Sequence, residues 1–418
     1  MSDQRKRIAI VGGNFAGLTA AIKLSRRHAV TLIDPSANFE WMPNIHEILS
    51  NVKTPQSLRL DRAAIVEQAG HRFLKDRVTV LQPAQGRLAT ASGVELAFDA
   101  CIVAVGALWN THHIPGVARH AMPFRSVADA LAIEHKLLAL VKQGKPLRIV
   151  IAGGGVSGVE ALGEILRRHR DDASLSVDVV EAGERLLTGL PPALDMDIRR
   201  LCEPYAVKFH TATAIASVTA KGVRLADGTR LRSELTLWTA GLAPPTLLRE
   251  SGLSPPPQLW ADVHQTLQSR HANNTFVIGD AAQLPHPVGK QAFRAIDMGS
   301  LAAANVQRFL DGRALVPFKP AAKPLLIAFG DLQTYLVAGR KVIASKLLAG
   351  AKEGVYQVFM SQMAPAGVLT ALPAAASRLW QGWRQLALPQ LMSLADFRKL
   401  PDVRPIRLLS VTQPGVTQ

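Results

Sequence analysis

LRIVIAGGGVSGVEALGEILRRH, residues 147–169, is the stretch that decides the fold. An apolar run enters a turn that contains Gly153, Gly155 and Gly158, and apolar residues at helical spacing follow it. In the pattern strand, G-x-G-x-x-G turn and helix, the first glycine makes the tight turn, the second admits a pyrophosphate, and the third lets the helix pack closely on the strand. The dipole and free N–H groups at the helix start favour the phosphate charge. The stretch therefore predicts a Rossmann-like dinucleotide-binding domain.

An acidic residue ends the next strand of this unit. VDVVEAG at residues 177–183 reads as a buried strand, and Glu181 stands at its end. A carboxylate at this place accepts hydrogen bonds from the hydroxyl groups of an adenosine ribose. Because the carboxylate would repel a 2′-phosphate, we predict that this turn binds NADH rather than NADPH.

A second βαβ pattern lies nearer the N-terminus, in RIAIVGGNFAGLTAAIKLSRRHAVTLIDPS at residues 7–36. Its turn contains three glycines, Gly12, Gly13 and Gly17. Asn14 stands where the middle glycine is usual. Asparagine tolerates unusual backbone angles better than most residues, and its side chain could contact a phosphate. Asp34 at the end of the second strand completes the pattern. Two such units predict two parallel sheets, each with a ligand crevice at its carboxyl edge.

The composition fits an ordered protein of two or three domains. The chain has 418 residues, of which 48% are hydrophobic and 19% are charged. The formal net charge of +16 attracts anionic cofactors, nucleic acid or lipid without choosing among them. The only cysteines, Cys101 and Cys202, exclude a disulfide framework and favour a reducing compartment. Since we find no signal segment and no apolar run of the ~18–20 residues that span a membrane, we expect a cytoplasmic protein, free or at a membrane surface.

Three further strand-like runs end in a glycine beside a small residue. They are ACIVAVGAL at 100–108, LTLWTAGLAP at 235–244 and TFVIGDAAQLP at 275–285. The glycines concerned are Gly106, Gly241 and Gly279. A residue without a Cβ lets the backbone approach a ligand closely, so we predict that all three border a cofactor.

Six motifs in this order resemble those of the flavoprotein reductases with two dinucleotide-binding domains, and most closely those of the type II NADH dehydrogenases. The motifs are VGGNFAG (11–17), AVGA (104–107), IPGVARHAMPFRSVADA (114–130), GGGVSGVE (153–160), LWTAGL (237–242) and TFVIGDAA (275–282). The resemblance covers roughly residues 7–360. It implies an α/β fold of two Rossmann-like domains, with the NADH domain inserted into the FAD domain and a C-terminal module that has amphipathic helices.

The order of the motifs also implies the domain bounds. The FAD domain would comprise residues 1–115 and 255–320, the NADH domain residues 116–254, and the C-terminal module residues 321–418. Hydride transfer from NADH to FAD needs no side-chain nucleophile, because the cofactors hold the reactive atoms and the protein supplies position and field. This agrees with a sequence in which we find no catalytic triad and no metal-binding cluster.

The resemblance assigns further residues to the two cofactors, FAD and NADH. Asp280 in the late motif would bind the ribityl chain of FAD, and Glu160, just after the NADH turn, would lie near the nicotinamide. The FAD turn would comprise Gly12, Gly13, Asn14, Phe15, Ala16 and Gly17, with Asp34 beside it.

The electron acceptor of the reduced flavin is harder to assign. Disulfide reductases of this superfamily carry a cysteine pair just after the first βαβ unit, where this chain has NFEWMPNIHEILS at residues 38–50 and no cysteine. Sulfide:quinone oxidoreductases use cysteines farther along, and neither Cys101 nor Cys202 matches them. Both cysteines read as small core residues, so we do not expect dithiol chemistry.

Type II NADH dehydrogenases carry an Ala-Gln-x-Ala-x-Gln signature at the quinone site. The corresponding segment here is AFRAIDM at residues 292–298, with Phe293 and Asp297 in place of the two glutamines. Phe293 could stack on a quinone ring, Lys290 could polarise a quinone carbonyl, and Asp297 could relay a proton. The alternative is that these residues begin an ordinary packing helix.

The segment FEWMPNIHE at residues 39–47 would lie close to the flavin by the same resemblance. His46 could donate a proton to a reduced acceptor, because the pKa of a histidine lies within physiological reach. The neighbouring Trp41 and Glu47 would share this place. A purely structural hydrogen bond of His46 is the alternative.

The C-terminal tail provides indirect evidence for a lipid-soluble acceptor. In AAASRLWQGWRQLAL at residues 374–388, Trp380 and Trp383 fall on one apolar helical stripe beside arginines. This combination suits the headgroup boundary of a membrane. The alternative is a helix that packs on its own protein or on a second copy in a homodimer.

We therefore expect an enzyme that transfers a hydride from NADH to FAD and then passes electrons to a quinone, at the cytoplasmic face of a membrane. The alternative is a soluble NADH-dependent flavoprotein reductase that acts on an iron–sulfur protein or a specialised metabolite, and the altered segment 292–298 counts in its favour. Nucleic-acid binding is suggested only by the net charge, and the scattered basic residues without a nucleic-acid motif argue against it.

Overall fold

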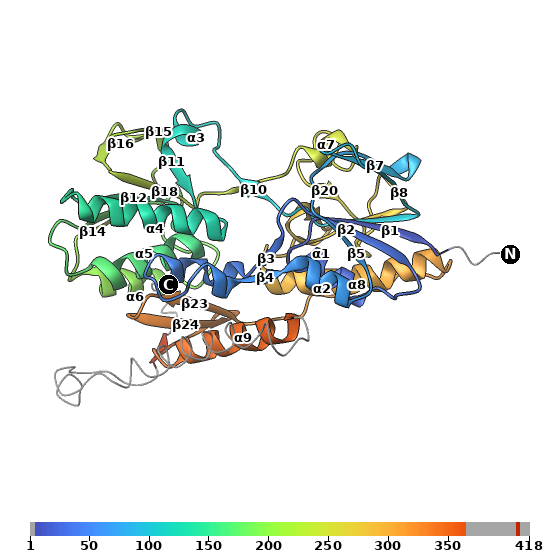
Figure 1. Cartoon of the computed structure of the whole chain (residues 1–418). Coiled ribbons are helices and arrows are strands. Elements are labelled where there is room, and N and C mark those ends of the chain that lie inside the picture. Colours follow the sequence, from blue (N-terminus) through green and yellow to red (C-terminus); the bar gives the residue numbers. More distant parts are fainter. Residues whose placement is uncertain (1–4, 365–406, 410–418) are drawn as a thin grey trace, which may run out of the picture.

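The computed structural model describes residues 5–364 and 407–409, and it contains two parallel five-stranded sheets (Figure 1). The first sheet has the strand order β21-β9-β1-β2-β5. Its central strand β1 is an almost continuous apolar run, as expected where both faces of a parallel sheet are covered. Its strands are β1 (Arg7–Val11), β2 (Ala29–Ile33), β5 (Arg72–Leu74), β9 (Ala100–Val103) and β21 (Thr275–Val277).

The second sheet has the strand order β11-β18-β12-β13-β14, again with all neighbours parallel. Each sheet has a glycine turn directly after a strand near its centre, β1 or β12, so each turn lies at a carboxyl edge. Its strands are β11 (Ala121–Pro123), β12 (Arg148–Ala152), β13 (Ser176–Val180), β14 (Val207–His210) and β18 (Leu235–Trp238).

The chain crosses between the sheets twice, and the two crossings pair with each other. β10 (Leu108–Trp109) runs antiparallel to β19 (Leu242–Ala243), and in Figure 1 this link lies between the two lobes. After the second crossing, β21 returns to the first sheet beside β9. The predicted nested order, with the NADH domain inserted into the FAD domain, is confirmed by this topology. The domain bounds at single-residue level stay a prediction.

Helix α1 (Phe15–Lys23) begins in the first glycine turn and packs on α8 (Ala292–Leu310). The two backbones come close because α1 is rich in small residues. A Cβ placed on Gly299 of α8 would lie 2.3 Å from the carbonyl oxygen of Ala16. This contact fixes the start of α1, and therefore the first turn, against α8.

The region after residue 320 forms an antiparallel sheet and one long helix. The sheet has the order β23-β24-β25-β26, and helix α9 (Leu348–Met363) packs on it below the two parallel sheets in Figure 1. The face that α9 buries includes two charged residues, Lys352 and Glu353. The strands are β23 (Leu325–Phe329), β24 (Gln333–Ala338), β25 (Lys341–Ala344) and β26 (Arg407–Leu409).

The remaining elements connect these layers. The helices are α2 (Arg62–Gln68), α3 (Val117–His120), α4 (Val127–Lys142), α5 (Val156–His169), α6 (Ala193–Cys202) and α7 (Leu247–Glu250). The short 3-10 helices are η1 (Met42–Ile48), η2 (Gln56–Leu58), η3 (Pro83–Gln85) and η4 (Gly279–Ala281). The short strands are β3 (Asn38–Glu40), β4 (Arg59–Asp61), β6 (Val78–Gln82), β7 (Arg87–Thr90), β8 (Glu95–Ala97), β15 (Ile215–Thr219), β16 (Gly222–Leu225), β17 (Arg230–Arg232), β20 (Ala261–Asp262) and β22 (Ala282–Gln283).

The predicted amphipathic helix at 374–388, with Trp380 and Trp383, lies outside the described residues. Among the residues that are described, no helix has both the length and the apolar character needed to cross a membrane.

Candidate active site

The two glycine turns have nearly the same backbone. Gly12 and Gly153 have φ angles of +96° and +107°, a region that L side chains rarely adopt. A Cβ on Gly17 would lie 1.8 Å from the Gly12 carbonyl oxygen, and one on Gly158 would lie 2.0 Å from the Gly153 carbonyl oxygen. Glycine is therefore required at the first and third positions of both turns by the protein itself.

The middle position of each turn is different, because its φ is negative. Asn14 has a φ of −92° and Gly155 has a φ of −73°, and a Cβ placed on Gly155 would meet no atom within 4 Å. A left-handed backbone conformation is therefore not required at Asn14. Its side-chain Oδ1 accepts a hydrogen bond from the backbone N–H of Glu40 at 3.1 Å. The predicted contact of Asn14 with a phosphate stays a prediction.

Both predicted acidic residues hold the second residue of their turn. Asp34 Oδ2 accepts from the N–H of Gly13, and Glu181 Oε2 accepts from the N–H of Gly154, both at 2.7 Å. The other oxygen of Glu181 accepts from the N–H of Gly183 at 2.7 Å. The carboxylates are thus fixed at the ends of β2 and β13, where a ribose would lie beside the turn.

A single cavity of about 1110 Å³ receives residues from both turns. It exceeds the ~300–1,000 Å³ of a pocket for one small ligand, so it has room for more than one. The sequence-predicted residues that line it are Asn14, Phe15, Ala16, His46, Gly106, Glu160, Gly241, Gly279, Asp280, Lys290 and Phe293. The turn glycines at 12, 13, 17, 153, 155 and 158 do not line it, and neither do Asp34, Glu181 and Asp297. The cavity is therefore the middle of the site, where the two ligands would meet.

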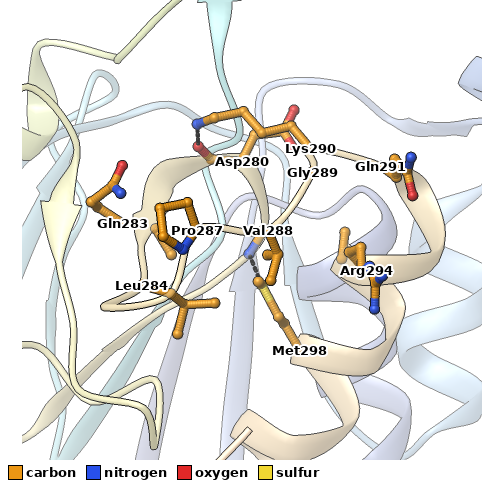
Figure 2. Close-up of a pocket in the computed structure, with 13 residues that line it drawn as sticks. Asp280, Gln283, Leu284, Pro287, Val288, Gly289, Lys290, Gln291, Arg294 and Met298 are labelled. Carbon is orange, nitrogen blue, oxygen red and sulfur yellow. Dashed lines mark hydrogen bonds between the residues drawn. The ribbon is translucent and has the colours of Figure 1, made fainter. Parts of the chain in front are cut away.

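Asp280 and Lys290 meet at one end of this cavity, beside a smaller hollow of about 120 Å³ (Figure 2). Lys290 donates a hydrogen bond to the backbone oxygen of Asp280, and its Nζ lies 3.1 Å from the ring centroid of Trp260. Burial lowers the pKa of Lys290 to about 8, and burial raises the pKa of Asp280. The Lys290 ammonium group is thus bonded within the protein, beside Asp280, the residue predicted to contact the ribityl chain.

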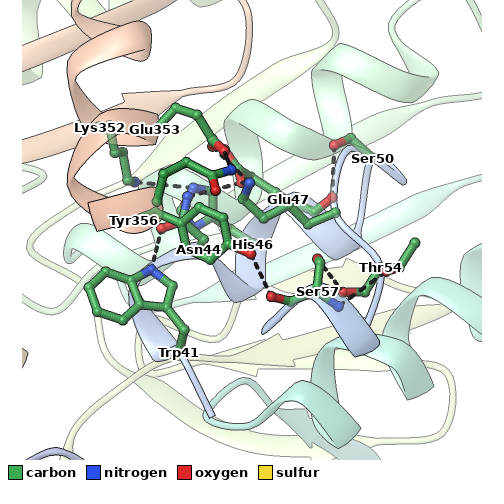
Figure 3. A network of polar contacts seen from close by, with 12 residues as sticks. Trp41, Asn44, His46, Glu47, Ser50, Thr54, Ser57, Lys352, Glu353 and Tyr356 are labelled. Atoms are coloured by element: carbon green, nitrogen blue, oxygen red, sulfur yellow. Dashed lines mark hydrogen bonds and ion pairs between the residues drawn. The ribbon is translucent and has the colours of Figure 1, made fainter. Parts of the chain in front are cut away.

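Residues of η1 and α9, among them His46 and Lys352, form a buried polar network (Figure 3). Glu160 of α5 contacts both of these side chains. Its Oε1 accepts from Lys352 Nζ at 2.5 Å and from the N–H of Ala328 at 3.2 Å. His46 joins both partners, because its Nδ1 lies 3.4 Å from Glu160 Oε2 and its Nε2 lies 3.2 Å from Lys352 Nζ. Since Glu160, His46 and Lys352 all line the cavity, this triad connects the cavity with the protein interior.

A second set of charges lies behind the triad. Lys53 Nζ is 2.7 Å from Glu353 and 3.7 Å from Glu47. Glu47 accepts a hydrogen bond from Asn44, which in turn accepts one from the indole N–H of Trp41. The network therefore runs from η1 to α9 without leaving the interior.

Burial sets the protonation tendencies in this network. Burial lowers the pKa of His46 well below its usual value, and the nearby Lys352 lowers it further, so the imidazole is neutral near pH 7. Burial raises the pKa of Glu160, although Lys352 opposes the shift. One helical turn further along α5, burial raises the pKa of Glu164 to about 7, and its Oε2 finds no hydrogen-bond partner among the described residues.

Lys352 and Glu353 were not predicted from the sequence. They are the only charged residues in α9, and a Lys-Glu pair in an otherwise uncharged helix is the signal that could have indicated them. No motif of the predicted cofactor turns extends to this helix, so the pairing with Glu160 and Lys53 emerges only in three dimensions.

The predicted acceptor residues differ in their surroundings. Phe293 lines the cavity and is 36% exposed. Both oxygens of Asp297 lie 2.7 Å from Lys323 Nζ, and Lys323 lines the cavity 5.7 Å from the ring centroid of Phe293. The segment also begins a packing helix, as the alternative interpretation states, because α8 starts at Ala292. Lys323 therefore brings a positive charge close to Phe293 in the cavity. The sequence did not indicate this residue.

The two cysteines lie away from the cavity, buried in β9 and α6. Burial raises the pKa of Cys202 to about 12 and raises that of Cys101 even further, so both thiols stay protonated near pH 7. Within residues 5–364, no group of three or more His, Cys, Asp or Glu side chains could hold a metal ion.

The chain is similar in sequence to a known family and to characterised proteins. The family model described as pyridine nucleotide-disulphide oxidoreductase matches residues 6–299. Demethylphylloquinone reductase NdbB of Synechocystis sp. is 26% identical over 352 residues, which cover 79% of this chain and 86% of that protein. The type II NADH:quinone oxidoreductase of Haemophilus influenzae is 27% identical over 380 residues, which cover 78% and 85%.

Among solved structures, NDH2 from Plasmodium falciparum in complex with NADH superposes with a TM-score of 0.81 at 16% identity. The match covers 93% of this chain and 99% of that one, and it shows that the two proteins share a fold. These matches confirm the resemblance predicted from the motifs, the α/β fold and the cofactors that it implies, FAD and NADH.

Proposed function

Because the chain belongs to the pyridine nucleotide-disulphide oxidoreductase family, we propose that it oxidises NADH and passes the electrons through FAD to a quinone. The observation that carries the proposal is the single cavity that receives residues from both turns, Ala16 on one side and Val156 and Glu160 on the other. The nicotinamide and the flavin can therefore meet in one space. Bound flavin would supply the two-electron chemistry, and the protein supplies position and field.

The first turn, with Asp34, fits the adenosine and pyrophosphate of FAD. Gly12 and Gly17 keep the backbone of this turn free of side chains, and the start of α1 offers N–H groups to phosphate charge. Next to Ala16 of this turn, Gly279 and Asp280 would hold the ribityl chain, with Lys290 beside them. Gly106 would border the flavin ring.

The second turn fits NADH in the same way, with Glu181 on the ribose. Gly153, Gly155 and Gly158 would hold the pyrophosphate, and Gly241 lies in the cavity where the nicotinamide end would be. Glu181 favours NADH over NADPH because its carboxylate would repel a 2′-phosphate. Arg185 cannot offset this repulsion, since its guanidinium donates to the backbone oxygens of residues 186, 187, 188 and 190.

Glu160 is the residue to which we assign proton transfer. Reduction of a quinone to a quinol consumes two protons per two electrons, and a carboxyl group whose pKa is raised by burial can deliver and recover a proton. Lys352 holds Glu160 Oε1, and neutral His46 lies between them, so the group is fixed at the cavity wall. A role of His46 as proton donor to the acceptor stays a prediction, since its Nδ1 faces Glu160 and its Nε2 faces Lys352.

The acceptor would enter at the end of the cavity formed by Phe293, Leu325 and Leu326. An apolar ring can stack on Phe293, and Lys323 supplies a cation that can polarise a quinone carbonyl. We assign Asp297 the task of orienting Lys323, in place of a direct proton relay, because it pairs with Lys323 and does not line the cavity.

Spectroscopy of the purified full chain tests the proposal. NADH added without oxygen should bleach the flavin absorbance, and a short-chain quinone should restore it. Bleaching that no quinone reverses, but that an iron–sulfur protein does reverse, would favour the alternative of a soluble reductase. A preparation without flavin would overturn both.

We also propose that the chain attaches to a membrane surface through residues 374–388, at the cytoplasmic face. The support is the Trp380 and Trp383 stripe of the sequence together with an acceptor class that is lipid-soluble. Flotation of the full chain with anionic liposomes should succeed, and the double substitution Trp380→Ser and Trp383→Ser should reduce it. If flotation is unaffected while the chain proves dimeric, the tail serves a homodimer contact instead.

A further inference from the structure

Arg62 is a buried arginine whose guanidinium group bonds to the first turn and to the chain beside it. It opens helix α2, and only 2% of its surface is exposed. Its Nε donates to the backbone oxygen of Gly13 at 2.7 Å, and its Nη1 donates to Asp34 Oδ1 at 2.7 Å. It also donates to the backbone oxygens of Ser36 and Asn38. One guanidinium thus ties the turn, the carboxylate and the loop after β2 together.

The contact with the turn is close enough to explain a glycine. A Cβ on Gly13 would lie 2.6 Å from Leu32 Cδ2 and 2.7 Å from both Cδ and Nε of Arg62. Gly13 therefore leaves room for the Leu32 and Arg62 side chains, not for a ligand, and it does not line the cavity. Since the N–H of Gly13 is held by Asp34 and its oxygen by Arg62, both polar groups of this peptide residue are fixed by one ion pair.

The second turn holds its corresponding glycine, Gly154, without a cation. The backbone oxygen of Gly154 accepts from the N–H of Leu187 at 2.9 Å, and a Cβ on Gly154 would lie 2.6 Å from the Leu186 side chain. Among residues 5–364, no cation forms an ion pair with Glu181. A leucine side chain packs on this glycine in both turns, and in the second turn a backbone hydrogen bond replaces the bond from Arg62.

The difference has an electrostatic consequence. A dinucleotide brings a pyrophosphate with two negative charges to its turn, and the nearby acidic residue repels it. Arg62 offsets the charge of Asp34, whereas Glu181 keeps its full charge. A buried cation is expensive to desolvate, and burial lowers the pKa of Arg62 although Asp34 opposes the shift, so the pair is stable only with all its acceptors in place.

We propose that Arg62 is a positioning residue that makes FAD the resident cofactor of the first turn, while the second turn, which lacks such a cation, exchanges its dinucleotide. The turn is held in its binding shape before FAD arrives, so less conformational freedom is lost on binding. The inference rests on the proposed function only in that FAD occupies the first turn.

The test measures retention of FAD by the full chain and does not rely on turnover. Flavin per protein after gel filtration and the release rate of FAD, followed by the recovery of flavin fluorescence on dilution, are compared in wild type, Arg62→Gln and Arg62→Lys. We expect Arg62→Gln to release FAD about 30-fold more readily, and Arg62→Lys to lie between, because lysine keeps the charge but cannot reach all four acceptors. The dissociation constant of NADH for FAD-reconstituted protein should change less than about twofold.

Two further arginine substitutions serve as matched controls. Arg26 donates to the backbone oxygens of Gln68 and Ala69 at the far end of α2, so Arg26→Gln removes similar bonds without touching the turn and should leave FAD retention unchanged. Arg185→Gln loosens the loop beside Glu181 and should weaken NADH binding, not FAD retention.

Wild-type retention of FAD in Arg62→Gln would overturn the inference while leaving the proposed function intact. So would an equal loss of FAD and NADH affinity together with a lower melting temperature of the apo-protein, because that result means general destabilisation. If Arg62→Gln does not fold, Arg62→Lys decides between the same outcomes. A wild-type protein that carries no flavin would instead contradict the proposed function.

Discussion

The turn after β1 and the turn after β12 have matching backbones, yet their surroundings differ in charge. Behind the first turn lie the Arg62–Asp34 ion pair and an aromatic cluster in which the Phe15 ring centroid is 5.1 Å from that of Phe39 and 5.5 Å from that of Trp41. Behind the second turn lie Leu186 and Glu181, which has no ion-pair partner within residues 5–364. One backbone device therefore serves two kinds of binding, depending on what packs against it.

The helices that follow the two turns differ in their acidic residues. α1 contains no acidic residue and packs with its small side chains on α8. α5 buries two carboxyl groups, Glu160, which bonds to Lys352 of α9, and Glu164, which lies 3.7 Å from Arg167. The helix after the first turn thus contributes no acidic group, whereas the helix after the second turn brings two into the interior.

The largest effect is expected from a methyl group on the third glycine of either turn. In both Gly17→Ala and Gly158→Ala the new Cβ would meet a backbone oxygen at 2.0 Å or less. We expect weaker FAD binding in the first variant and a higher KM for NADH in the second, each on the order of 100-fold. Flavin content and steady-state kinetics report the two effects separately, and loss of flavin in Gly158→Ala would show that the turns are not independent.

A smaller effect is expected when the acid function of α5 is removed. Glu160→Gln should lower kcat with quinone by about tenfold to 100-fold, because the carboxyl group no longer transfers a proton. Reduction of the flavin by NADH, measured by stopped-flow absorbance, should change far less. Glu67→Gln, at an exposed residue of α2 that does not line the cavity, is the control and should change kcat by less than about threefold. Equal slowing of both half-reactions in Glu160→Gln would assign the residue to binding.

The stability of the protein should depend on pH through Glu164, which lies in the second βαβ unit. The pKa of Glu164 is raised to about 7 in the folded protein, above its unfolded value, so its contribution to stability is full at low pH and is lost as the pH rises through 7. Glu164→Gln should therefore be more stable than wild type at pH 8, by on the order of 1–3 kcal/mol, and gain least at pH 4. Chemical denaturation at both pH values measures this. Glu67→Gln, an exposed residue of α2, should show no such dependence.

The smallest effect is expected from restoring the usual glycine of the first turn. Asn14→Gly removes the hydrogen bond to the N–H of Glu40, a loss of about 1 kcal/mol in the free energy of unfolding. Because φ is negative at Asn14 and glycine can adopt the same angles, FAD affinity should change less than about threefold. Titration of apo-protein with FAD tests this. A much larger loss of FAD affinity would mean that the Asn14 side chain contacts the phosphate directly.

The sequence alone determined the two turns, the nested order of the domains and the place of Asp280 in the late motif. These features are local: a positive φ at Gly12 or a helix start against Gly153 leaves no alternative to glycine, so spacing along the chain reveals them. The acidic residues at strand ends are visible for the same reason. Glu160 could be named by resemblance, because it stands at a fixed distance from its turn.

Only the tertiary structure decided which charges meet. Arg62 lies 49 residues from Gly13, and Lys352 lies 192 residues from Glu160, so no spacing rule connects them. Lys323 likewise changes the role of Asp297 from a free acid to a paired one. A buried charge is stable only where desolvation is offset by partners, and those partners come from whichever segments the core brings together. The backbone geometry of the turns can therefore be predicted from the local sequence, whereas the charge contacts of the site depend on which distant segments pack together.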